Sequence, residues 1–172
     1  MNTRKYLIKN SLVARLVGCC VSLASAGNPP FFTTDAVLNA KGELLMTQKG
    51  TRHLDIFSAD GKSLLHSFPF DEIPTGLLPD GDKVYVTTFE KTGRLQVLSL
   101  ESGRVEAAIP TGSGACHPMF GPDKKHIYVC NQFDNSVVEI DPVMRKVVRS
   151  VKVLREPKSA VFSKDGKYMF VT

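Results

Sequence analysis

The chain has 172 residues, of which 42% are hydrophobic and 23% are charged, and its formal net charge is +5. This composition allows the core of a globular domain. The basic balance would point to nucleic acid or an anionic membrane, but four of the 22 Lys and Arg residues and none of the 17 acidic residues lie in the first 26 positions. The remaining chain has 18 bases and 17 acids, a net charge of +1, which does not support a nucleic-acid partner.

Residues 1–26 have the pattern of an export signal. An apolar run at residues 16–24 follows a leader without acids and ends in Ala24-Ser25-Ala26, the small-x-small pattern that signal peptidase reads. The run is too short to span a bilayer, which takes about 20 apolar residues. We predict a signal peptide over residues 1–26 and a periplasmic or extracellular protein. The tetrad Leu16-Val17-Gly18-Cys19 also resembles a lipoprotein processing site, so lipidation of Cys19 is the alternative.

The rest of the chain alternates short apolar runs with turns made of Asp, Asn, Gly and Pro, the pattern of paired strands. A first, degenerate unit is expected to have strands at 36–38, 43–47, 54–57 and 63–68. The second unit is expected at 75–78, 83–88, 94–99 and 104–109. The third is expected at 117–120, 126–130, 136–140 and 146–151. A fourth begins at 158–162 and enters its second strand at Tyr168.

These units repeat at a fixed period. The step from Tyr85 to Tyr128 is 43 residues, and the step from Tyr128 to Phe170 is 42. A period of about 40 to 45 residues with several short strands is typical of propeller blades. We therefore predict an all-β fold, a β-propeller of four-stranded blades with about three and a half blades present. The partial propeller covers residues 27–172, with blades at approximately 31–70, 74–110, 116–153 and a truncated 157–172.

Closed propellers have about four to eight blades. We therefore expect the chain to be a fragment of a longer reading frame, with closure by a second copy as the alternative. Unpaired strand edges template pairing with other chains, so we also expect self-association through open blade edges.

One stretch, residues 122–142 and their continuation, carries a recognisable repeat. Its pieces are Tyr128-Val129-Cys130-Asn131, Asp134-Asn135-Ser136-Val137, Ile140-Asp141-Pro142 and Arg145-Lys146-Val147-Val148. They resemble the repeat of the YVTN β-propeller family, and the resemblance extends from about residue 74 to the end and more weakly over 36–73. It implies an exported propeller of the bacterial surface or periplasmic type. It does not imply a reaction, because this fold hosts many unrelated functions.

A propeller usually binds its ligand at the mouth of the central channel, between loops that enter and leave the inner strands. In this chain, those loops contain the following candidate residues: Thr75, His117, Asn131, Gln132 and Lys158.

Two cysteines, Cys116 and Cys130, are candidates for a disulfide bond. Cys116 lies seven residues before Asp123, the centre of a predicted turn, and Cys130 lies seven residues after it. Positions equidistant from a hairpin turn face each other with Cβ atoms about 4.5 to 5.5 Å apart, whereas a disulfide needs about 3.5 to 4.5 Å. Export to an oxidising compartment favours a disulfide, and burial as free cysteines is the alternative.

Other chemistry has little support in the sequence. No C-x-x-C, H-x-x-x-H or G-x-S-x-G motif occurs, so we predict no metal, no catalytic residues and no cofactor. The segment Ser113-Gly114-Ala115-Cys116-His117 is similar to the haem motif C-x-x-C-H but lacks its first cysteine. We interpret it as a loop between blades. The recurring Asp80, Asp123 and Asp165 are interpreted as turn residues.

We therefore expect a non-enzymatic binding module whose partner is a protein, a cell-envelope component or a polysaccharide. The alternative is the propeller portion of a periplasmic redox protein, similar to cytochrome c peroxidases or quinoproteins, whose redox centre lies outside this chain. We interpret the surplus of bases in residues 117–172 as an ordinary solvated face. The alternative is a basic surface on the third blade around Arg145, Lys146, Arg149 and Lys152 that meets an anionic partner.

Overall fold

The structure is a computed structural model that describes residues 33–172. The predicted signal peptide, residues 1–26, lies outside the described residues. Over the described range every regular element is a strand, and the strands form three antiparallel sheets of four strands and one sheet of two. The predicted all-β class is confirmed. No helix in residues 33–172 is long and apolar enough to cross a membrane.

Each sheet is made from strands that follow one another in the chain, so each is one blade. Blade 1 contains β1 (Thr33–Leu38), β2 (Leu44–Gln48), β3 (His53–Phe57) and β4 (Leu64–Pro69). Blade 2 contains β5 (Pro74–Asp80), β6 (Lys83–Thr88), β7 (Gly93–Ser99) and β8 (Val105–Gly112). Blade 3 contains β9 (Ala115–Phe120), β10 (Ile127–Asn131), β11 (Ser136–Asp141) and β12 (Lys146–Lys152). Blade 4 contains β13 (Ala160–Phe162) and β14 (Met169–Val171).

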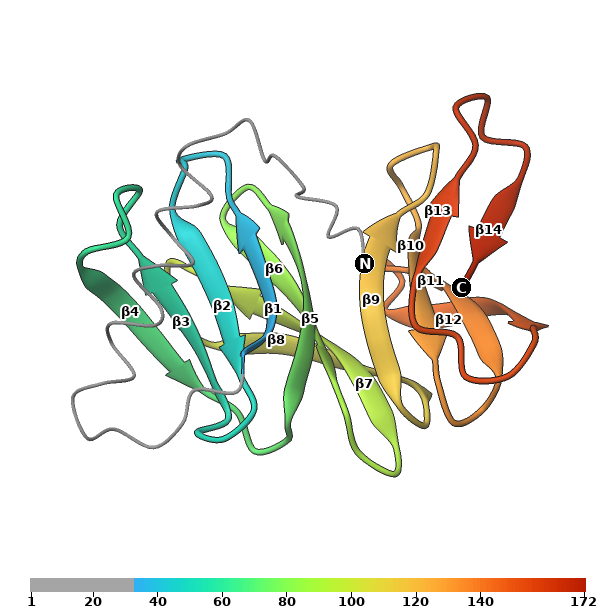
Figure 1. Cartoon of the computed structure of the whole chain (residues 1–172), viewed down its shortest axis with the longest axis horizontal. Coiled ribbons are helices and arrows are strands. Elements are labelled where there is room, and N and C mark those ends of the chain that lie inside the picture. Colours follow the sequence, from blue (N-terminus) through green and yellow to red (C-terminus); the bar gives the residue numbers. More distant parts are fainter. Residues whose placement is uncertain (1–32) are drawn as a thin grey trace, which may run out of the picture.

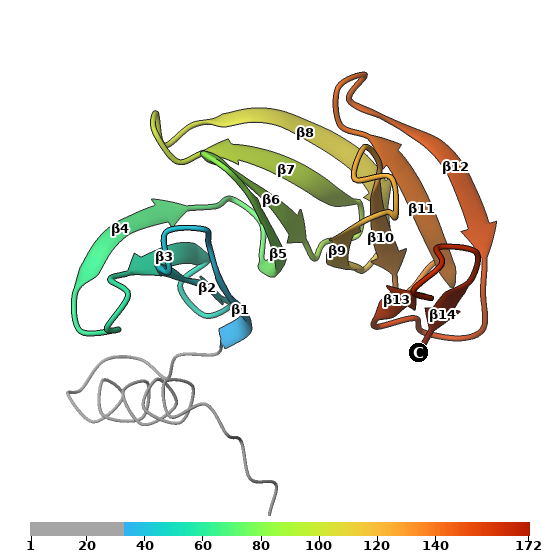
Figure 2. The same ribbon diagram turned by 90° about the horizontal axis from the view of Figure 1, so that it is seen from above.

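The blades stand side by side along an arc (Figures 1 and 2). The first strand of each blade, β1, β5, β9 or β13, lies on the concave side, and the fourth strands β4, β8 and β12 lie on the convex side (Figure 2). This placement agrees with the burial pattern: the second strands β6 and β10 are mostly buried, whereas β4 and β12 are mostly exposed. The middle strands of blades 2 and 3 lie between two neighbouring blades, as in a propeller.

The turns within the blades use aspartate as predicted for Asp123 and Asp165. Asp123 Oδ1 accepts hydrogen bonds from the backbone N–H groups of Lys125 (2.9 Å) and His126 (3.2 Å). Asp165 Oδ1 accepts from the backbone N–H of Lys167 (3.2 Å) and from the hydroxyl of Ser163 (2.6 Å). A short carboxylate that satisfies nearby backbone amides stabilises a tight turn. These side chains are therefore engaged in local structure.

The apolar core lies between blades. One buried cluster joins blade 1 to blade 2 through Leu45, Leu54, Ile56, Phe70, Leu77, Val84, Val86 and Leu98. A second joins blade 2 to blade 3 through Tyr85, Leu95, Val97, Ile109, Ala115, Ile127, Val129, Val138 and Ile140. A smaller cluster of Cys130, Val137 and Ala160 joins blade 3 to blade 4. Burial of apolar surface between sheets thus fixes the relative position of neighbouring blades.

A polar contact repeats on the concave side of the blades. The side-chain oxygens of two threonines on the first and second strands approach each other: Thr34 and Thr47 (2.7 Å) in blade 1, and Thr75 and Thr87 (3.0 Å) in blade 2. The first threonine of each pair also donates to a carbonyl of the next blade: Thr34 to Pro74 and Thr75 to Ala115, both at 2.8 Å. We call this arrangement the threonine seam.

Candidate functional site

The five predicted site residues all lie near one end of the blades, where the inner strands begin, but they serve different purposes. Thr75 belongs to the threonine seam, so its hydroxyl is occupied within the structure. The Nε2 atom of His117 lies 3.1 Å from the carbonyl oxygen of Ala160 and 3.3 Å from the hydroxyl of Ser159. Both residues therefore connect neighbouring blades.

Asn131 ends β10 opposite Ala115, the first residue of β9. Its side chain is fully buried, and its Nδ2 donates to the carbonyl oxygen of Thr111 at 2.9 Å. Its Oδ1 has no hydrogen-bond partner among the described residues. A buried amide of this kind holds two chain segments together, so the described contacts of Asn131 are structural.

Gln132 is different, because it lines a cavity of about 360 Å³ at this end of blade 3. The cavity is formed by the β10–β11 loop and the segment after β12, and its other lining residues are Phe133, Asn135, Arg155 and Glu156. We call it the Gln132 cavity. Lys158, the fifth predicted residue, is exposed two residues beyond Glu156 but is not part of the lining.

Three hydrogen bonds hold the β10–β11 loop in place. The backbone N–H groups of Gln132 and Phe133 donate to the carbonyl oxygens of Gly114 (3.0 Å) and Ser113 (3.1 Å). The backbone N–H of Ser113 donates to Asp134 Oδ2 at 2.7 Å. The loop is thereby tied to the β8–β9 connection.

The far wall of the cavity is tied to the same loop. Asn135 Oδ1 accepts from the backbone N–H of Glu156 (2.8 Å), and its carbonyl oxygen accepts from the backbone N–H of Val153 (2.9 Å). The ammonium group of Lys152 donates to the carbonyl oxygen of Asp134 at 2.9 Å. Asn135 therefore links the two walls of the cavity.

The cavity exposes an aromatic ring and a cation. Phe133 is 57% exposed, and its ring packs edge-to-face on Phe89 of blade 2 with the centroids 5.0 Å apart. The guanidinium of Arg155 is exposed and forms no ion pair within residues 33–172. An aromatic face, two amides, an unpaired cation and the carboxylate of Glu156 together can bind a polar ligand that carries both apolar and charged groups.

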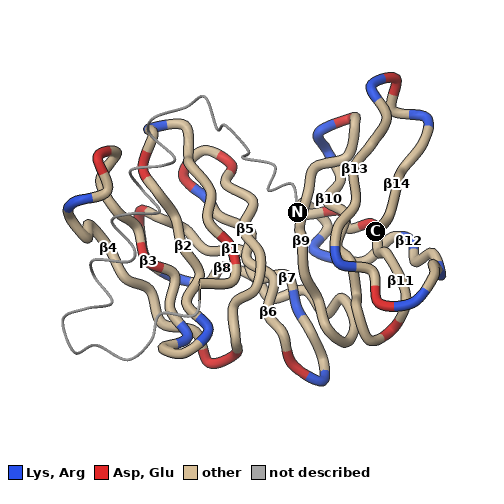
Figure 3. The backbone as a smooth tube through the Cα atoms, viewed as in Figure 1, with Lys and Arg blue, Asp and Glu red and all other residues tan. Residues whose placement is uncertain are grey.

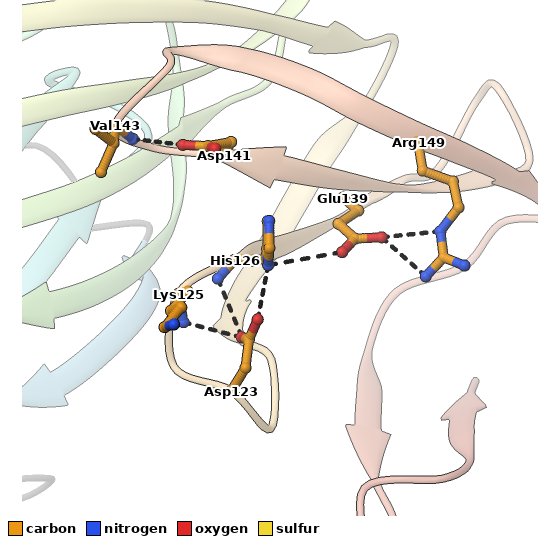
Figure 4. Close-up of polar contacts among 7 residues, drawn as sticks. All are labelled: Asp123, Lys125, His126, Glu139, Asp141, Val143 and Arg149. Atoms are coloured by element: carbon orange, nitrogen blue, oxygen red, sulfur yellow. Dashed lines mark hydrogen bonds and ion pairs between the residues drawn. The ribbon is translucent and has the colours of Figure 1, made fainter.

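The opposite end of blade 3 carries a network of charged side chains (Figure 4). His126 Nδ1 lies 2.7 Å from Asp123 Oδ2 and 3.8 Å from Glu139 Oε1. The Nε and a terminal nitrogen of Arg149 each donate to Glu139 Oε2 at 2.8 Å. Hydrogen bonding to Asp123 raises the pKa of His126, and hydrogen bonds from Lys125 and His126 lower the pKa of Asp123 to about 2.

This network includes Arg149, one of the residues of the predicted basic surface. Lys and Arg are frequent on blades 3 and 4 (Figure 3), with 10 bases and 6 acids in residues 117–172. Arg149 is neutralised by Glu139, and Lys152 is used by the β10–β11 loop. Two of the four residues of that surface are therefore engaged within the blade.

The two cysteines of the described range face each other across β9 and β10. The strand register places Cys116 opposite Cys130, and both are free thiols. Cys130 is buried and Cys116 is half-buried. Burial raises the pKa of Cys116 to about 11 and that of Cys130 to about 12.

No group of three or more His, Cys, Asp and Glu side chains in residues 33–172 is arranged to hold a metal ion. Sequence reasoning selected Gln132 but missed Phe133, Asn135, Arg155 and Glu156, which complete the cavity. The nearest signal was the polar run at residues 131–135 between two strands. Its meeting with residues 155 and 156, about 20 positions later, depends on the path of the chain after β12.

The sheets and their order define a partial β-propeller that has a cavity at one end of its third blade. No known protein-family model matches the sequence. Over 128 residues the chain is 29% identical to the antigen Lp49 of Leptospira interrogans serogroup Icterohaemorrhagiae serovar copenhageni (strain Fiocruz L1-130). The matched region is 69% of this chain and 28% of the antigen. The structure of this chain resembles the hydrazine synthase of Kuenenia stuttgartiensis, with a TM-score of 0.73 and 18% sequence identity.

The structural match covers 86% of this chain and 44% of the hydrazine synthase chain. The chain thus spans less than half the length of either protein. At 18% identity the second likeness concerns the fold alone, and it agrees with the β-propeller architecture.

Proposed function

We propose that this chain is the propeller portion of an exported protein that binds an acidic polysaccharide of the cell envelope, without catalysis, in the Gln132 cavity. The observation that carries the proposal is the lining of that cavity. It combines the amides of Gln132 and Asn135, the exposed ring of Phe133, the unpaired guanidinium of Arg155 and the carboxylate of Glu156.

Sugars match this combination chemically. The ring of Phe133 can pack against the C–H face of a pyranose, while amides exchange hydrogen bonds with its hydroxyl groups. Arg155 can form charge-assisted hydrogen bonds with a carboxylate on the sugar or on an attached peptide. A volume of about 360 Å³ falls in the range of about 300 to 1,000 Å³ that is usual for small-ligand sites and suits one or two sugar rings.

Two sequence observations support the exported, envelope-associated part of the proposal. Residues 1–26 have the pattern of a signal peptide, and the strand and turn motifs of blades 2 to 4 resemble those of YVTN-repeat propellers, which implies a surface or periplasmic protein. The similarity to a protein named as an antigen is in keeping with this placement.

The test is co-sedimentation of the full chain with purified, insoluble peptidoglycan, an envelope polysaccharide whose peptide stems carry carboxylates. We expect saturable binding that Arg155→Ala weakens about tenfold, the effect of losing one or two charge-assisted hydrogen bonds. Lys125→Ala is the matched control, because it removes one exposed positive charge at the opposite end of the same blade.

The control should bind like the unmodified chain. Absence of saturable binding would contradict the choice of polysaccharide. An equal loss in Arg155→Ala and Lys125→Ala would show non-specific attraction to the anionic polymer and would contradict the choice of site.

A further inference from the structure

We propose that Cys116 and Cys130 are a modification site, at which a disulfide-type oxidant joins the first two strands of blade 3 by a cross-strand disulfide. This inference is independent of the proposed ligand. It rests on the strand register and on the place that the two cysteines occupy in the repeat.

In blade 3, Cys116 and Cys130 occupy the positions that the threonine pairs of the seam occupy in blades 1 and 2. Thr34, Thr75 and Cys116 follow one another at intervals of 41 residues, and each lies near the start of the inner strand of its blade. Like Thr34 and Thr75, Cys116 points at the next blade, with Sγ 3.7 Å from the carbonyl oxygen of Lys158 and 3.8 Å from that of Pro157. Cys130 stands on the second strand, as Thr47 and Thr87 do.

The threonine pairs show that side chains at these two positions meet. Their hydroxyl oxygens are 2.7 and 3.0 Å apart. In blades 1 and 2 the Cα partner of the second-strand threonine is the residue after the first-strand threonine, Asp35 or Gly76. In blade 3 the partner of Cys130 is Cys116 itself. The two cysteines therefore stand directly opposite in the strand register, and the close approach of Cα and Cβ atoms across two strands is what a disulfide requires.

The chemistry is an exchange with a small or protein disulfide, RSSR, such as an oxidising compartment supplies. The thiolate of half-buried Cys116 attacks one sulfur and releases RS⁻, which takes up the proton that Cys116 lost. The thiolate of Cys130 then attacks Sγ of Cys116 and releases a second RS⁻, which is protonated in turn. Two thiols are oxidised to one disulfide, and RSSR is reduced to two RSH.

The environment favours a persistent bond over a reactive dithiol. Burial raises the pKa of both thiols, to about 11 and about 12, so little thiolate exists at neutral pH. Cys130 also packs in the small cluster between blades 3 and 4. The exchange is therefore expected to be fastest at alkaline pH or before blade 4 packs against Cys116.

The experiment treats the full chain with oxidised glutathione at mildly alkaline pH, alkylates the remaining thiols and digests the unreduced protein with trypsin. Cleavage after Arg104, Lys124, Lys125 and Arg145 places Cys116 in peptide 105–124 and Cys130 in peptide 126–145. We expect one linked peptide, lighter than the sum of the two by two hydrogen atoms, which separates on reduction. Recovery of both peptides in alkylated form, or a link from either to the peptide with Cys19 and Cys20, would overturn the proposal.

The double variant Cys116→Thr/Cys130→Thr is the matched control, because it installs the pair that blades 1 and 2 already carry. Oxidation should raise the Tm of the unmodified chain by several degrees, since it closes a loop of 15 residues. The Tm of the double variant should not respond to the oxidant. An equal response of both proteins would contradict a bond at this site, and the peptide map decides the matter if the variant does not fold.

Discussion

His126 Nδ1 lies 2.7 Å from Asp123 Oδ2, so the turn that joins the first two strands of blade 3 is closed by an ion pair as well as by backbone hydrogen bonds (Figure 4). Glu139 and Asp141 also act on the imidazole and raise its pKa further. Every charged group that shifts the pKa of His126 upward is thus an acid on its own blade.

This pair predicts a pH-dependent stability that His126→Gln removes. The pKa of His126 is higher in the folded chain than the unfolded value of about 6.5. Its contribution is therefore complete below pH 6.5 and is lost as the pH rises through the folded pKa. The difference in Tm between the unmodified chain and His126→Gln should shrink from pH 5.5 to pH 8.5. A difference that is constant over this range would contradict the ion pair.

For Asp123 we predict a stability contribution with the opposite pH dependence, which is lost at acid pH. Its folded pKa of about 2 lies below the unfolded value of about 4, so its contribution is present above pH 4 and is lost as the pH falls through 2. Asp123→Asn should lower Tm at pH 5 and have little effect at pH 2, if the chain is still folded there. Thermal unfolding followed by circular dichroism measures both.

Gly112→Ala should disturb the Gln132 cavity. Gly112 has φ of 142°, and an added Cβ would lie 2.6 Å from Asp134 Oδ2 and 2.7 Å from Asn131 Nδ2. Gly81→Ala is the control, because Gly81 also has a positive φ but its Cβ would meet no atom within 4 Å. Both variants carry backbone strain of about 1 kcal/mol. We expect Gly112→Ala to be less stable than Gly81→Ala by at least about 1 kcal/mol in urea unfolding, and equal stabilities would contradict the close packing around Asp134.

Leu95→Ala tests whether the core lies between blades. Leu95 is fully buried in the cluster shared by blades 2 and 3, so the loss of its side chain should cost about 2 to 5 kcal/mol of unfolding free energy. Leu65→Ala is the control, since Leu65 is 42% exposed on β4, and it should cost less than about 1 kcal/mol. Similar costs for both variants would place the core elsewhere.

The sequence predicted the blades well because each is built from local signals. Asp-Gly and Asp-Lys turns separate short β-branched runs, and the period of about 42 residues arises from repeating that local unit. Counting from Asp123 paired Cys116 with Cys130, and the structure has this pair beyond a register shift between Tyr128 and Cys130.

The cavity was harder to predict because it depends on contacts between segments that no local pattern couples. Phe133 is held by Phe89 from another blade, and Arg155 reaches the cavity through the path after β12. Thr75 and Asn131 were selected as polar residues near a loop, but their side chains are used between strands and blades. A sequence shows which side chains are polar, whereas the fold decides which of them remain unpaired.

The most direct test of the proposed function is to map the binding site by NMR. The isotope-labelled full chain is titrated with soluble peptidoglycan fragments, and backbone amide shifts are followed. We predict that the shifts concentrate at residues 132–135 and 154–156, that Arg155→Ala needs about tenfold more fragment to reach them, and that Lys125→Ala leaves the titration unchanged. Shifts centred on the β9–β10 turn at the other end of blade 3, or no shifts at saturating fragment, would contradict the Gln132 cavity as the ligand site.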